Sequence, residues 1–275
     1  MLMRRYRLAL ICACVSLMAA PAHAQGQSQS HRPPRTPRTP QTNKPKTTGT
    51  AGRTALPIAG IVLASWLDDA DTLEPGRLNL GVSIGRWTSL DGGETEGPAA
   101  DVSVGVLNGV QLGASLPYYR ASYSDGFNIS GLGDSYFVAK LRLIDPGEHA
   151  IGVAVAPTLE VLSESAVSDT TLGLSRVNFA FPISVEIDRD ATRVYATGAY
   201  FTRGATSLGG AVEHTLHERV TLAGTVTYSH TTRTLTTTDL ADLSPSRTDV
   251  SGGIYFKLSP SVTATGSLGR TISRL

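Results

Sequence analysis

The chain of 275 residues has few cysteines, few aromatic residues and no long apolar run. Its two cysteines, Cys12 and Cys14, both lie in the apolar stretch at residues 8–20. That stretch is well short of the roughly 20 residues that a membrane-spanning helix needs, and no later segment approaches that length. A helical membrane protein is therefore excluded. Beyond residue 20 the chain also has no cysteine for a disulfide, a thiolate nucleophile or a metal site.

The N-terminus has the three parts of a secretory signal peptide. Arg4, Arg5 and Arg7 precede the apolar run, and Ala22 and Ala24 flank His23 in the A-x-A pattern after which signal peptidase cuts. We therefore expect residues 1–24 to be a signal peptide that is cleaved on export.

Residues 25–55 are rich in Gln, Ser, Thr and Pro, carry a charge of +6 and include no acidic residue. Such a segment cannot bury enough apolar surface to fold, and we expect a disordered, basic tail. Residues 56–275 hold 15 basic and 23 acidic residues, a net charge of −8. An acidic body argues against a nucleic-acid partner.

From residue 78 onward, apolar residues alternate with small or polar ones in segments of about ten, which predicts strands. The pattern is clearest at residues 175–187. One parity there is apolar, and the other includes Arg176, Asn178, Ser184 and Glu186. Side chains of a strand point alternately to its two faces, so each such strand has one apolar and one hydrated face.

A soluble β-sandwich would also alternate, but three features favour a transmembrane barrel. The segments are long enough to cross a bilayer as tilted strands, and their polar parity carries ionisable residues in mid-strand, such as Lys140 and Arg142. The connections also alternate, with short turns and longer polar loops at 89–99, 120–132, 162–172 and 231–246. Only 6% of residues are aromatic, too few for two full girdles, but several lie toward the long-loop end, where one belt is expected. These are Trp87, Tyr118, Tyr119, Tyr136, Phe137, Tyr200, Phe201 and Tyr228.

The pattern gives eleven strands, whereas single-chain bacterial barrels have an even number. We expect about twelve natively, so one strand is missing from the count. It follows residue 275 in a longer chain, lies in the Thr-rich stretch 231–242, or is formed by residues 56–67. The eleven are expected at 77–88, 100–108, 109–119, 133–144, 148–161, 173–187, 193–203, 206–216, 219–230, 247–258 and 261–273.

No catalytic or metal-binding constellation is recognisable, so we expect no enzyme activity, no metal and no cofactor. His214 shares parity with Leu208 and Val212 and should face lipid, which a bulge or an interfacial position would explain. Asp68, Asp69 and Asp71 could hold calcium, but without a spaced ligand loop a solvated acidic loop is the preferred interpretation. A nucleophile that assembles across strands is not excluded by sequence, so a barrel hydrolase remains the second alternative.

Several segments resemble the outer-membrane barrels grouped with the meta-pathway of phenol degradation. They are DTLEPGRLNLG at 71–81, LPYYR at 116–120, GLGDSYF at 131–137, AKLRL at 139–143 and LSPSVT at 258–263. The resemblance covers about residues 71–275. It implies an outer-membrane channel that admits aromatic or other apolar solutes, and it supplies no catalytic residues.

The sequence therefore predicts an all-β, antiparallel transmembrane barrel at residues 77–275, with residues 56–76 as a lead-in segment. We expect it in the outer membrane of a Gram-negative bacterium, with lipid as its surroundings, as a channel or uptake protein for small solutes, aromatic or hydrophobic ones among them. The first alternative is a structural or loop-presenting barrel without conductance. The residues expected to line the lumen are Asp101, Lys140, Arg142, Glu160, Arg176 and Glu186.

Overall fold

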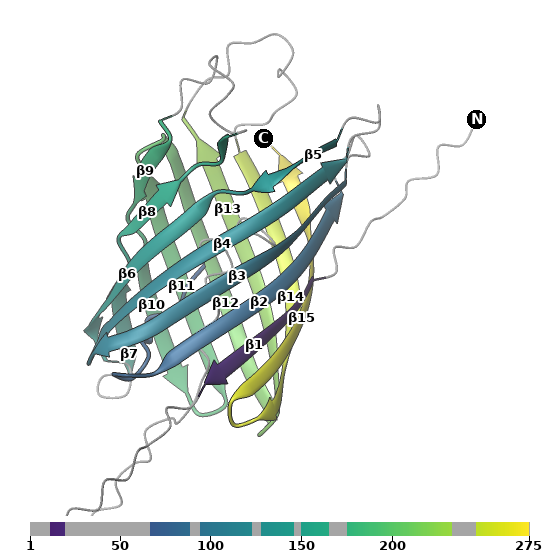
Figure 1. Ribbon diagram of the computed structural model, residues 1–275. Helices are drawn as coiled ribbons and strands as arrows, with labels where there is room; N and C mark the ends of the chain where they lie inside the picture. The colour runs from purple at the N-terminus through teal and green to yellow at the C-terminus, as the bar shows by residue number, and fades with distance from the viewer. Residues whose placement is uncertain are drawn as a thin grey trace, which may run out of the picture.

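A computed structural model describes residues 12–19, 67–88, 94–122, 128–145, 150–164, 175–232 and 246–274. The described strands form one antiparallel sheet whose pairings run around a closed ring (Figure 1). The expected all-β barrel is thus confirmed. In the described part of the chain, no helix has the length and apolar character needed to cross a bilayer.

Fifteen strand segments make up the ring, in agreement with the alternating pattern. Three pairs of them, β5 with β6, β7 with β8 and β9 with β10, are each two parts of one wall strand, so the described residues form twelve wall strands. Their bounds are β1 Cys12–Ala19, β2 Leu78–Thr88, β3 Glu94–Leu107, β4 Val110–Ser122, β5 Asn128–Leu132, β6 Ser135–Ile144, β7 Ile151–Val155, β8 Thr158–Val161, β9 Val177–Ala180, β10 Ile183–Arg189, β11 Thr192–Phe201, β12 Ala205–His217, β13 Val220–Thr231, β14 Ser246–Ser259 and β15 Val262–Arg274.

Proline explains two of the three breaks in the wall. Pro157 separates β7 from β8, and Pro182 separates β9 from β10; neither has an N–H to give to the ladder. The carbonyls still pair across the breaks, since Ala139 N donates to Pro157 O at 3.0 Å and Ala156 N donates to Pro182 O at 2.9 Å. The wall therefore bends without losing contact between neighbouring strands.

The twelfth strand is β1, which none of our three candidates named. It pairs antiparallel with both β15 and β2 and so closes the ring. Its residues belong to the apolar run that predicts a signal peptide, and cleavage of that peptide remains a prediction. Removal of residues 1–24 would leave β2 and β15 without the strand between them. Of the candidate stretches 56–67 and 231–242, residues 56–66 and 233–242 lie outside the described residues, Thr231 is the last residue of β13, and Leu67 lies inside the barrel.

The barrel has the inverse of a soluble protein's polarity. Large apolar side chains line its outside, such as Ile183 at 53% exposed, Val226 at 49% and Leu268 at 52%. The inward parity buries polar and charged groups, including Lys140, Glu160, Glu186 and Arg193. An apolar belt of this extent around a polar interior is expected of a wall whose outside faces hydrocarbon.

The turns also follow the predicted rhythm, with some loops shorter than expected. Asn108 and Gly109 form the tight turn between β3 and β4, and Gly109 has a φ of +74°, a conformation that glycine adopts without steric cost. The loops expected at 89–99 and 120–132 are shorter, because β3 begins at Glu94 and β5 occupies part of the second loop. Of the expected aromatic belt, Tyr118, Phe137, Tyr200 and Tyr228 are exposed, but Tyr136 and Phe201 are buried.

A charge on the outer face tests this orientation. Val226 lies near the middle of β13, so Val226→Arg should lower the free energy of unfolding in lipid vesicles by about 2–4 kcal/mol, the cost of a basic residue at the bilayer midplane. Urea titration of the refolded protein measures it, with Val226→Leu as the control. A change below about 0.5 kcal/mol, as for an exposed site in water, would contradict a lipid-facing β13.

Candidate functional site in the lumen

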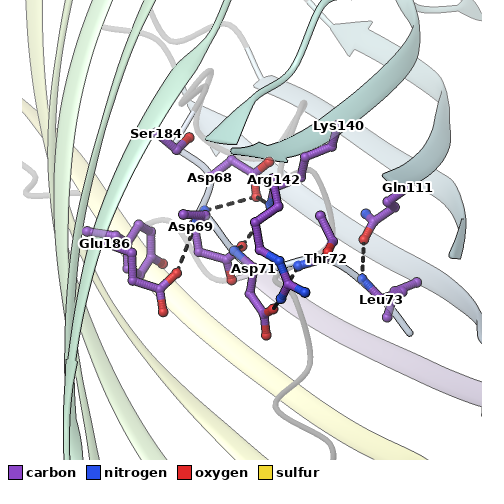
Figure 2. Close-up of polar contacts among 12 residues, drawn as sticks. Asp68, Asp69, Asp71, Thr72, Leu73, Gln111, Lys140, Arg142, Ser184 and Glu186 are labelled. Atoms are coloured by element: carbon purple, nitrogen blue, oxygen red, sulfur yellow. Dashed lines mark hydrogen bonds and ion pairs between the residues drawn. The ribbon is translucent and has the colours of Figure 1, made fainter. Parts of the chain in front are cut away.

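The chain that leads into β2 lies inside the barrel. Residues 67–74, here called the lumen segment, contact side chains or backbone of β3, β4, β6, β10, β11 and β12. Figure 2 shows the contacts to Gln111, Lys140, Arg142 and Glu186. Asp69 and Ala70 have no exposed surface. The interpretation of Asp68, Asp69 and Asp71 as a solvated acidic loop is therefore wrong. These carboxylates neutralise basic groups of the inner wall.

Asp69 is held between two bases from different strands. Its Oδ1 accepts a hydrogen bond from Lys140 Nζ of β6 at 2.7 Å, and its Oδ2 accepts one from Arg193 Nη1 of β11 at 2.8 Å. The Lys140 and Arg193 side chains are 2% and 4% exposed. Charge-assisted bonds in such a poorly solvated place are strong, and removing one partner leaves a buried charge without compensation.

Two further carboxylates of the segment bind the same side of the wall. Asp68 Oδ1 lies 3.0 Å from Lys140 Nζ, and Asp71 Oδ1 lies 3.0 Å from Arg142 Nη1. Arg142 also pairs with Asp145, at 3.0 Å. Asp71 and Arg142 are more exposed than Asp69, so their ion pair contributes less.

The wall also binds the backbone of the segment. Ala70 N donates to Glu186 Oε2 at 2.9 Å, and Leu73 N donates to Gln111 Oε1 at 2.9 Å. Thr197 Oγ1 donates to Asp68 O at 2.6 Å and lies 3.0 Å from Asp68 N. Buried peptide groups need such partners, and here side chains of β4, β10 and β11 supply them instead of a strand.

Shape fixes the two ends of the segment. Leu67 packs in a buried cluster with Tyr195 and Ala211, and a Cβ on Gly209 would come within 3.2 Å of its side chain. At the other end, Gly76 has a φ of +78° and donates to Gly105 O at 2.8 Å. A Cβ on Gly105 would overlap the carbonyl oxygens of Leu73 and Glu74, so only glycine lets the chain pass this close to β3.

Arg193 has wall partners in addition to Asp69. Its Nη2 lies 2.8 Å from Glu213 Oε2 and its Nη1 lies 3.7 Å from Glu186 Oε1. Glu213 also accepts from Tyr195 OH at 3.1 Å. For Lys140, by contrast, both acidic partners found among the described residues, Asp68 and Asp69, belong to the lumen segment.

The three carboxyls of the segment differ in pKa. Burial raises the pKa of Asp68 above its ordinary 3.8, against the attraction of Lys140. Burial also raises the pKa of Asp71, and the negative charge of Asp69 adds to this. Burial opposes ionisation of Asp69 too, but the charges of Lys140 and Arg193 outweigh it and lower its pKa.

Five of the six residues expected to line the lumen have the inward parity of their strands. Lys140, Glu160 and Glu186 are buried, whereas Asp101 and Arg142 are partly exposed. Arg176 is exposed and lies just before β9. The structure brings Lys140, Arg142 and Glu186 together around the lumen segment; Glu160 instead pairs with Arg203, at 3.1 Å.

Arg193 and Glu213 were not among the predicted lumen residues, although Glu213 has the parity opposite to His214, which was expected to face lipid. Their strands were found, so listing every charge on the inward parity would have identified them. No pattern showed that the acidic residues before β2 are their partners. That pairing joins positions 69 and 193, which only the closed ring brings together.

The described residues give no support to a hydrolase or a metal site. His214 is on the outer face, where Thr192 Oγ1 lies 2.8 Å from its Nδ1, near a register shift at Thr215 and His217. His230 Nδ1 lies 2.8 Å from Ser246 Oγ, but no described acid bonds the other ring nitrogen, as a triad would require. Among the described residues, no group of His, Cys, Asp and Glu is arranged to hold a metal.

No family model matches the chain, and no curated protein matches it. The resemblance to the phenol-degradation barrels is thus not confirmed. Among solved structures, the chain is similar to the NanC porin in a rhombohedral crystal form, with a TM-score of 0.44 and 11% identity over 66% of this chain and 94% of that one. It is also similar to the translocation pore of the P pilus usher PapC, with a TM-score of 0.29 and 10% identity over 74% of this chain and 50% of that one.

Asp69→Asn tests the central ion pair. The near-isosteric change removes the charge that compensates Lys140 and Arg193, and breaking a buried pair costs about 3–5 kcal/mol. Hydrogen exchange at the Ala70 and Leu73 amides should accelerate at least about a hundredfold. Glu74→Gln is the matched control, because Glu74 is an exposed acid of the same segment. Equal protection in both variants would show that the carboxylate of Asp69 does not hold the segment.

The pKa directions predict that mild acid does not release the segment. Asp68 and Asp71, with raised pKa values, bind protons more readily when docked, so falling pH does not weaken their contribution. Asp69 stabilises the docked segment fully above pH 3.8, the ordinary pKa of an aspartate. That stabilisation is lost only as the pH falls through the lower pKa that Asp69 has in the docked state. Spin labels at Glu74→Cys and Lys257→Cys, without Cys12 and Cys14, should report one distance at pH 7 and 5. A second distance appearing between these two values would contradict the assignment.

Proposed function

We propose that the protein is an outer-membrane channel whose lumen is closed by its own lumen segment. The observation that carries the proposal is the Asp69 ion pair with Lys140 and Arg193, because it fastens a non-strand segment inside a barrel whose inner face is polar. A barrel of about eight strands fills its interior with side chains of its own wall, whereas a wider wall leaves a lumen, which here is occupied by a separate segment.

The outer surface supports the membrane assignment. Exposed leucine, isoleucine, valine and phenylalanine side chains occur on strands around the ring, and contact with lipid removes that surface from water. Closed barrels satisfy every backbone group within the wall, which is what a strand needs to cross a bilayer. We further propose that residues 1–24 direct export. Residues 25–55, for which the sequence predicts a disordered basic tail, lie outside the described residues.

The lumen supports charged solutes better than the aromatic or hydrophobic ones that the resemblance implied. Where the segment binds, the apolar contact is the recess filled by Leu67 beside Tyr195 and Ala211, whereas the ion pairs and hydrogen bonds to the segment come from charged and polar side chains. We therefore propose small solutes that combine a charge with at most one modest apolar group. The alternative is a structural barrel without conductance, and a conductance measurement distinguishes it from the channel.

Conductance measured with and without an engineered disulfide, here called the cysteine lock, that holds the lumen segment in place tests the channel. Leu67→Cys with Ala211→Cys, in a background without Cys12 and Cys14, joins two residues of one buried cluster and should tie the segment to β12 when oxidised. In planar bilayers the oxidised protein should show no current steps and the reduced protein rare ones. Adding Asp69→Asn to the reduced protein should raise the open fraction about tenfold or more.

Leu67→Cys alone is the control for the oxidant. Current steps that persist in the oxidised double variant would show that the segment does not close the lumen. Solute flux no greater than in protein-free membranes, for the reduced protein carrying Asp69→Asn, would reject the channel and leave the structural barrel.

A further inference from the structure

The inner wall is built to bind an acidic peptide. Four side chains of β6, β10 and β11, here called the cradle, surround residues 68–70 of the lumen segment: Lys140, Glu186, Arg193 and Thr197 (Figure 2 shows Lys140 and Glu186). All four are at most 4% exposed. None of them is needed to pair strands, because the ladders there are made by backbone groups.

The cradle contacts both kinds of group that an acidic peptide carries. Lys140 and Arg193 each take one oxygen of the Asp69 carboxylate, at 2.7 and 2.8 Å. Glu186 accepts the peptide N–H of Ala70, and Thr197 donates to the carbonyl of Asp68. A simple inorganic anion would use the two bases and leave the acceptor of Glu186 unused.

An apolar recess adjoins the cradle. Leu67 fills it against Tyr195 and Ala211, and Gly209 leaves the room that a side chain would take. A solute that replaces the segment can therefore place one apolar residue beside its carboxylate. The contacts of the wall therefore suit a peptide with the sequence of residues 67–70, in which one apolar residue is followed by two acidic residues and a small one.

The open state needs a replacement anion. When the segment leaves, Arg193 retains Glu213 and Arg142 retains Asp145, but Lys140 loses the acids that pair with it among the described residues. A buried ammonium without a partner is unfavourable, so the empty cradle favours either the return of the segment or a bound carboxylate.

We propose that the cradle is a binding site for short acidic peptides and that the lumen segment is its internal occupant, which such a solute displaces. The proposal rests on the proposed channel, because it makes this site the place where a solute is recognised on its way through. Competition between the segment and the solute sets the apparent affinity, since only the fraction of protein with an empty cradle binds.

The test is calorimetric titration of the refolded full-length protein with the peptide acetyl-Leu-Asp-Asp-Ala-amide, with acetyl-Leu-Asn-Asn-Ala-amide as the uncharged match. Only the acidic peptide should bind. Asp69→Asn weakens the internal occupant and should raise the affinity about a hundredfold, in step with the faster opening of the segment, whereas Glu74→Gln should leave it unchanged. Adding Lys140→Gln to Asp69→Asn should remove that gain.

The cysteine lock keeps the test independent of folding, because the same protein is measured oxidised and reduced. Oxidation should abolish peptide binding and reduction should restore it. Equal binding in both states, equal binding of the two peptides, or no gain from Asp69→Asn would overturn the inference. If the variants bind the acidic peptide with the predicted ranking of affinities but none conducts, the proposed channel is wrong and the proposed peptide site is supported. If the released variant conducts and the peptide does not bind, the inference alone fails.

Discussion

The structure of the lumen depends on the compensation of buried positive charge. Lys140 and Arg193 point from the wall into an interior with little access to water, and both use the carboxylate of Asp69. An uncompensated ion in such a place costs several kcal/mol, so the segment that precedes β2 stays bound to the wall unless another anion takes its place. The remaining contacts of the segment, from the Leu67 cluster to the passage beside Gly105, serve to bring this one carboxylate between its two bases.

The wall itself follows from a simpler constraint. In the membrane that we propose as its surroundings, the backbone finds no hydrogen-bond partners outside the wall, so every strand must pair on both edges and the ring must close. Pro157 and Pro182 are tolerated because neighbouring carbonyls still accept bonds across the breaks. The same constraint makes the edge between β2 and β15 a position that must be filled, and in this structure β1 fills it.

Local pattern was enough to predict eleven of the twelve wall strands. Alternation located these strand regions, most of them to within a few residues. Parity alone placed Lys140 on the face opposite to Phe137 and Leu141, and Lys140 is buried whereas Phe137 and Leu141 are exposed. The site was not predictable in the same way. Asp69 and Arg193 lie 124 positions apart, and neither carries a local signal that identifies the other. The strand that completes the ring was also missed, because its apolar run fits a signal peptide and a barrel strand equally well.

The most direct measurement is an experimental structure of the full-length protein in lipid nanodiscs, for the wild type and for Asp69→Asn. The account predicts that residues 67–74 lie across the lumen in the wild type, with Asp69 between Lys140 and Arg193, and that they leave the lumen in the variant while the wall is unchanged. A wild-type lumen without the segment, or a segment that stays docked in the variant, would contradict it.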